Sequence, residues 1–79
     1  MAEKFPSMKW PKFRRVLERK PLLYEAARQT GSHTVFKSRA GYPDLYLAFH
    51  DKAELPPGLI RKILCRDVRL SEEQALALL

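Results

Sequence analysis

Apolar residues recur at helical spacing in three stretches of the chain, and they alternate with polar residues in the segments between them. The first stretch begins at Pro11, which suits the first turn of a helix because its missing N–H is not needed there. Phe13, Val16 and Leu17 then form one apolar stripe. The next proline disfavours helical geometry in the residue before it, so the predicted helix ends near Lys20.

Three strands are predicted over residues 22–29, 33–38 and 44–50, where the chain is bounded by glycine and proline. Gly31 supplies the backbone freedom that a tight turn needs, and Ser32 can hydrogen-bond within that turn. The first two strands should therefore form a hairpin.

The two-residue period of a strand puts His33 and Lys37 on the same face, with one apolar residue between them. Which face of this strand is buried stays open. In the third strand, Leu45 and Leu47 belong to the face that is the better core candidate. His50 lies on the other face, at the end of the strand.

The second helix is entered through residues 56–58 and carries an apolar stripe over residues 59–64. Cys65 adjoins the stripe and is most simply a small packed residue. Ser71 and Gln74 have the spacing of a capping box, which predicts the start of a short and rather apolar last helix.

The fold class that follows is α+β, with the order helix, three strands, helix and a short C-terminal helix. A three-stranded antiparallel sheet would carry the helices on one face and leave the other face open for a ligand. This α-β-β-β-α order is that of double-stranded-RNA-binding domains. Residues 1–7 are expected to form a flexible leader and residues 8–79 a single domain, and Met8 is an alternative start to Met1.

Charge adds a candidate partner. The chain carries a formal net charge of +6, with a pI near 9.8, concentrated in residues 1–20 and 61–69. Such a surface attracts nucleic acid, acidic protein or anionic lipid, with a solvated basic surface as the plain alternative. The charge favours a nucleic-acid partner without defining sequence or strandedness.

Composition excludes several classes of protein. The single cysteine cannot form an internal disulfide, and one cysteine with two histidines makes no spaced set of metal ligands. No secretory signal and no apolar run of membrane-spanning length is found. We therefore expect a cytoplasmic protein that needs no metal or cofactor and has no membrane partner.

Four blocks in order resemble the HicA-type, or YcfA-like, toxins of bacterial toxin–antitoxin pairs. They are residues 8–20, the Gly-Ser-His strand motif within 30–37, the second-helix entry at 55–64, and the tail from Leu70-Ser71-Glu72-Glu73 to Leu79. The resemblance implies an mRNA interferase, which cleaves transcripts and arrests translation and growth until a HicB-type antitoxin covers it. It also implies a fold like that of double-stranded-RNA-binding domains, with one essential histidine, which maps onto His33.

Cleavage of RNA needs few parts, because the 2′-OH of the RNA is the nucleophile. Our hypothesis is that His33 does the acid–base work and that Lys37 stabilises phosphate charge from the same strand face. His50 is a candidate second proton carrier, with a structural role as its alternative. The candidates for holding the RNA backbone are four further cations: Arg28, Arg39, Lys12 and Arg15.

The resemblance implies a toxin that is a monomer when free and a hetero-oligomer with its antitoxin. Two other functions compete with this interpretation. One is a non-catalytic RNA-binding module of similar fold, and the other is a protein-interaction domain. Each candidate cation also has the plain reading of a solvated charge. The three tyrosines, Tyr24, Tyr42 and Tyr46, are expected to pack within the sheet rather than to stack on bases.

Overall fold

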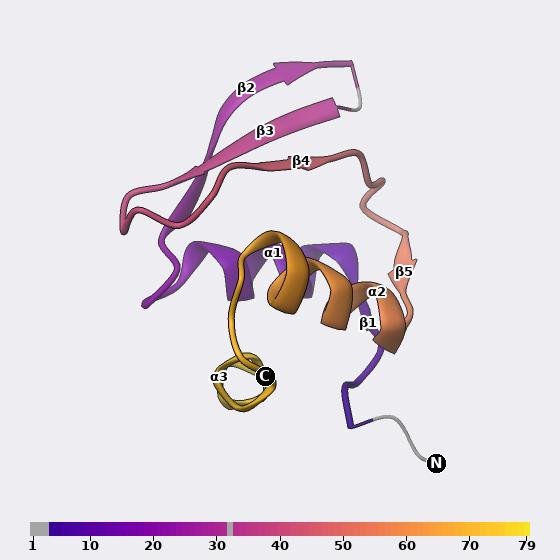
Figure 1. The fold of residues 1–79 in the computed structure, drawn as a ribbon. Coiled ribbons are helices and arrows are strands. Elements are labelled where there is room, and N and C mark those ends of the chain that lie inside the picture. Colours follow the sequence, from indigo (N-terminus) through magenta and orange to yellow (C-terminus); the bar gives the residue numbers. More distant parts are fainter. Residues whose placement is uncertain (1–3, 32) are drawn as a thin grey trace.

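The computed structural model describes residues 4–31 and 33–79 of the chain. It confirms a small α+β fold in which a three-stranded antiparallel sheet lies over helices (Figure 1). The sheet is made of β2 (Tyr24–Thr30), β3 (His33–Ser38) and β4 (Leu45–Leu47). The helical elements are α1 (Trp10–Glu18), α2 (Pro57–Arg61), the π-helical segment η1 (Lys62–Asp67) and α3 (Glu72–Ala77).

The sheet is a meander in the order β2-β3-β4, and the hairpin between its first two strands is confirmed. Its register runs from the pair Tyr24↔Ser38 to the pair Thr30↔His33 at the hairpin end. A bulge between Ala26 and Arg28 interrupts the register. Residues directly opposite each other across strands point to the same face, so the register assigns each paired side chain to a face.

The inner face of the sheet is the one that carries Phe36, which resolves the question left open by the alternation. The Phe36 side chain is 0% exposed, and its ring meets that of Trp10 edge-on, with 5.8 Å between ring centroids. Leu45 and Leu47 are buried beside it, as predicted. His33 is exposed and belongs to the opposite, outer face.

Helix α1 forms where the apolar stripe predicts it and ends two residues earlier than expected, at Glu18. Proline stands in its first turn, where its missing N–H is not needed. Phe13 and Leu17 are fully buried against the sheet and the second helical element. This helix covers the inner face of the sheet.

The second helix is not uniform. It begins as α2 and continues as η1, where the Val68 N–H bonds the Ile63 carbonyl at 2.9 Å, five residues back. An apolar stripe at helical spacing does not distinguish this wider turn from an α-helix, so the sequence could not predict it. Ile63 and Val68 are both buried in the core.

The capping box is confirmed at the start of α3. The Ser71 hydroxyl accepts from the Gln74 N–H, and the Gln74 side-chain carbonyl accepts from the Ser71 N–H, both at 3.0 Å. Ala75 is buried, so the last helix docks on the core.

The N-terminal boundary differs from the expected leader over 1–7. Phe5 is 3% exposed and belongs to the core, so apolar burial begins before Met8; residues 1–3 lie outside the described residues. Two short strands were not predicted: β1 (Met8–Lys9) pairs with β5 (Glu54–Leu55). Two-residue strands are too short to show an alternation.

No helix in the described ranges is both long enough and apolar enough to cross a membrane.

Tyr24 makes the fold sensitive to alkali. Its side chain is buried, its hydroxyl donates to the Pro43 carbonyl, and burial, reinforced by the nearby Asp44 carboxylate, raises the pKa of Tyr24 to about 12. An ordinary tyrosine in the unfolded chain titrates near pH 10, so the folded chain binds more protons between the two values. We expect the free energy of unfolding to fall as the pH rises from about 10 to 12.

This prediction is checked by urea unfolding at several pH values, with Tyr24→Phe beside the unmodified chain. The phenylalanine variant should lose most of the decline in that pH range, because it has no proton to release. An identical decline in both proteins would mean that other groups cause it.

Candidate functional site

The outer face of the sheet is open to solvent and carries the candidate chemistry. Because the helices lie on the inner side, nothing in the described part of the chain covers it (Figure 1). We define the outer face by the cross-strand rows that make it: Thr30 with His33, Arg28 with Val35 and Tyr46, and Glu25 with Lys37. This one surface therefore carries positive, negative and aromatic side chains.

His33 is the first residue of β3 and stands opposite Thr30 at the hairpin end. Gly31 beside it has φ +61°, in the left-handed region that glycine adopts without strain. Ser32, the other supporting residue of the motif, lies outside the described residues. His33 is exposed, and in the described ranges no side chain hydrogen-bonds its imidazole.

Arg28 is the cation nearest to His33 on this face. It pairs across the strands with Val35, one row from the Thr30↔His33 pair. Diagonal neighbours of this kind lie about 7–8 Å apart in an antiparallel sheet, within reach of a long side chain. Arg28 is thus placed to hold a phosphate group that contacts His33.

Lys37 shares the outer face with His33, as the strand period required. Four residues separate them, which is about 13 Å along a strand. Lys37 also stands opposite Glu25, and its ammonium lies 3.8 Å from the Asp44 carboxylate. The Asp44 carboxylate thus offsets part of its charge, and Lys37 is placed for a neighbouring phosphate rather than for the one beside His33.

Tyr46 departs from the expectation of sheet packing. Its side chain is 75% exposed, next to Val35 in the middle row of the outer face. Tyr24 is buried and Tyr42 packs partly against the core, so those two match the expectation. In the sequence, the exposure of Tyr46 was indicated by its position between Leu45 and Leu47, whose side chains point to the inner face.

The remaining predicted cations do not join this group. Lys12 and Arg15 are exposed on α1, in the helical layer under the inner face. Arg39 is exposed in the turn that follows β3. The structure therefore places Arg28, His33 and Lys37 on one face, with Arg28 nearer to His33, and it separates Lys12 and Arg15 from them.

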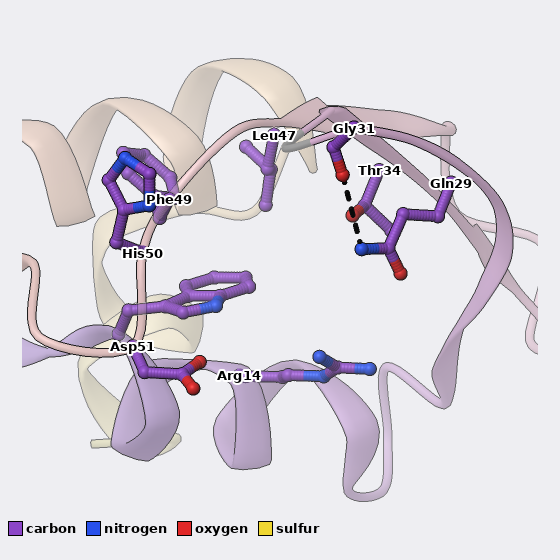
Figure 2. Close-up of a pocket in the computed structure, with 9 residues that line it drawn as sticks. Arg14, Gln29, Gly31, Thr34, Leu47, Phe49, His50 and Asp51 are labelled. Atoms are coloured by element: carbon purple, nitrogen blue, oxygen red, sulfur yellow. Dashed lines mark hydrogen bonds between the residues drawn. The ribbon is translucent and has the colours of Figure 1, made fainter.

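The prediction that His50 ends the third strand, on the face opposite Leu45 and Leu47, is wrong, because β4 ends at Leu47 and His50 lies beyond it. His50 lines a hollow of about 410 Å³ between the hairpin end and α1, on the inner side of the sheet (Figure 2). His33 is not among the residues that line it, so the two histidines do not face a common site. Sequence reasoning missed this hollow because four separate segments form its walls.

Cys65 is half-buried beside Arg61 and Lys62, and burial raises the pKa of its thiol. Its packed position agrees with the sequence expectation. Within residues 4–31 and 33–79, no group of three or more His, Cys, Asp or Glu side chains is arranged to hold a metal ion.

Comparison of the chain with protein-family models, with curated proteins and with solved structures finds no match.

Proposed function

We propose that the protein is a metal-independent endoribonuclease, the toxin of a HicA-type toxin–antitoxin pair. The observation that carries the proposal is the diagonal placement of His33 and Arg28 on the open outer face of the sheet, with the exposed ring of Tyr46 in the same cross-strand row as Arg28. The three side chains supply a proton carrier, a phosphate-binding fork and a surface for a base.

The proposed reaction uses the RNA's own nucleophile. The His33 imidazole takes the proton of a 2′-OH while the 2′ oxygen attacks the adjacent phosphorus. The bond from phosphorus to the 5′ oxygen then breaks, and that oxygen receives the proton back from the imidazolium. The products are a 2′,3′-cyclic phosphate and a 5′-hydroxyl end, and no electron donor or cofactor is consumed.

Arg28 assists by holding the non-bridging oxygens, where negative charge builds up during the attack. A guanidinium binds two such oxygens with a planar fork, and it remains charged throughout the reaction. Its diagonal position beside His33 allows both groups to act on one phosphate.

The wider biological role is part of the same proposal. The four sequence blocks support a fold like that of double-stranded-RNA-binding domains and a cytoplasmic toxin with mRNA as substrate. A HicB-type antitoxin would cover the protein in a hetero-oligomer, and the free toxin would be a monomer. The net charge of +6 supports attraction to RNA and to an acidic partner surface.

Tyr46 should contribute to binding of single-stranded RNA. Stacking of a base on an aromatic side chain is worth about 1–3 kcal/mol, so Tyr46→Ala should weaken binding by about 5–150-fold. The measurement is fluorescence anisotropy of a labelled oligonucleotide with a His33→Gln protein, which prevents cleavage. Tyr46→Phe is the matched control and should bind nearly as well as the parent, whereas undiminished binding by Tyr46→Ala would rule out stacking there.

The toxin role is tested by inducible expression in bacteria. We expect growth arrest with the unmodified chain and normal growth with His33→Ala at equal protein levels. Arrest that persists with His33→Ala would count against catalysis by this residue.

The second candidate is a non-catalytic RNA-binding module on the same face. It is favoured by one observation: no side chain in the described part of the chain orients the His33 imidazole. Catalytic histidines are usually positioned by a partner group. RNA binding without strand cleavage would establish this second reading.

A further inference from the structure

The hollow near His50 carries an inference that the outer face does not use. Its walls come from four segments: Trp10 and Arg14 on α1, Gln29 and Gly31 at the hairpin, Thr34 and Leu47 on the inner face, and Phe49 to Asp51 after β4. Figure 2 shows Asp51 and Arg14 along the helix side and Gln29 and Thr34 on the hairpin side, with open space between them.

Two opposite charges face this space without meeting. The Arg14 side chain packs over the Phe36 ring, with its guanidinium carbon 5.4 Å from the ring centroid, and its Nε donates to Glu18 at 3.1 Å. Arg14 is thereby held in place. Its terminal nitrogens are free of protein partners in the described ranges, as is the Asp51 carboxylate, and the two charges do not form an ion pair.

An aromatic floor completes the hollow. Trp10 is 5% exposed, and its ring lies 5.3 Å from that of Phe49 in a tilted arrangement. The indole N–H has no hydrogen-bond partner among the described residues, although tryptophan usually finds one when buried. Over residues 4–31 and 33–79, no buried side-chain nitrogen or oxygen lacks a partner, so this N–H retains contact with solvent.

We propose that the hollow binds a guanine base, and that it gives the proposed ribonuclease its preference for RNA containing guanine. The proposal rests on the proposed function for its biological meaning, but base binding can be measured without cleavage. Arg14 would donate to O6 and N7 of the base, and Asp51 would accept from N1–H and the N2 amino group. The Trp10 and Phe49 rings line the same hollow as these two charged groups.

Guanine is chosen because of its hydrogen-bonding edges. It offers two adjacent acceptors, which match the two-pronged donor of arginine, and two adjacent donors, which match the two oxygens of a carboxylate. Adenine, cytosine and uracil lack one of these paired edges. Each would leave part of the Arg14 or Asp51 group desolvated and unpaired, which reduces affinity.

The hairpin end connects the hollow to the proposed cleavage site. Gly31 and Thr34 line the hollow, whereas His33, between them in sequence, stands on the outer face. An RNA strand that passes over the hairpin end can place one base on the inner side while its backbone crosses the outer face. Cleavage is then expected close to a guanosine.

The test uses the chain's one tryptophan as a reporter. The full chain, labelled with ¹⁵N, is titrated with guanosine 3′-monophosphate, and the single indole N–H cross-peak of Trp10 is followed by NMR. We expect a saturable shift with this nucleotide. The adenosine, cytidine and uridine 3′-monophosphates should bind at least about tenfold more weakly, given the discrimination of a bidentate pair.

Asp51→Asn removes the paired acceptor and should weaken guanosine 3′-monophosphate binding about tenfold or more. Glu54→Gln is the matched control, because it removes a carboxylate three residues away that does not line the hollow, and its binding should be unchanged. Arg14→Lys keeps the charge and loses the planar fork, so it should also weaken binding.

Equal shifts with all four nucleotides, no shift with any, or an Asp51→Asn protein that binds like Glu54→Gln would overturn the proposal. Selective guanine binding by a protein that does not cleave RNA would support the base pocket and refute the nuclease. Cleavage that ignores guanine and survives Asp51→Asn unchanged would support the nuclease and refute the pocket.

Discussion

Replacing Phe36 by alanine should lower the free energy of unfolding by about 3–5 kcal/mol. The ring is fully buried on the inner face, meets Trp10 edge-on and lies under the Arg14 guanidinium. Its removal leaves a cavity between the sheet and α1 that the surrounding side chains fill only partly. A domain of this length has a total stability of about 4–12 kcal/mol, so this loss is a large fraction of the whole.

Urea unfolding followed by circular dichroism measures this effect. The matched control is Tyr46→Ala, because it removes an aromatic ring from the same sheet on the outer face. Its side chain is 75% exposed, so the change in stability should lie within about 0.5 kcal/mol. Similar losses in the two variants would contradict the assignment of inner and outer faces.

Replacing His33 by alanine should lower the rate of RNA cleavage by about 10²–10⁴-fold, the usual contribution of a positioned acid–base group. Binding of RNA should change little, because Arg28, Tyr46 and the general positive charge remain. Single-turnover cleavage of a labelled oligonucleotide gives the rate, and anisotropy with an uncleavable 2′-deoxy analogue gives the affinity.

His50→Ala is the control, since it changes the chain's other histidine, which lies on the inner side of the sheet. Its cleavage rate at saturating RNA should fall by no more than a few fold relative to the unmodified chain. A loss as large as that of His33→Ala would show that His50 takes part in the proton transfer, the role of second proton carrier for which the sequence made it a candidate.

Most of the sheet and of its flanking helices was predictable because the patterns are local, although the third strand spans only Leu45–Leu47 rather than residues 44–50. Alternation defined the strand over residues 33–38 to the residue, and the spacing of Ser71 and Gln74 defined the start of α3. The two-residue strands and the π-helical turn were not predictable, since neither changes the apolar pattern. Burial of Phe5 was missed because a single apolar residue shows no periodicity.

The candidate site was only partly predictable for a related reason. One strand places His33 and Lys37 on a common face, but only the register across strands shows that Arg28 is the closer cation. The same register exposes Tyr46, which its own strand could not reveal. The hollow is lined by residues of α1 and by residues after β4. No pattern in the sequence indicates that two segments so far apart along the chain lie side by side.

The most direct test of the central claim is RNA cleavage by the purified chain in excess EDTA, with His33→Ala measured beside it and both shown to be folded. We predict cleavage by the unmodified chain, ends that carry 2′,3′-cyclic phosphate, and loss of both with His33→Ala. Equal cleavage by the two proteins, or no cleavage by either while RNA remains bound, would contradict a nuclease centred on His33.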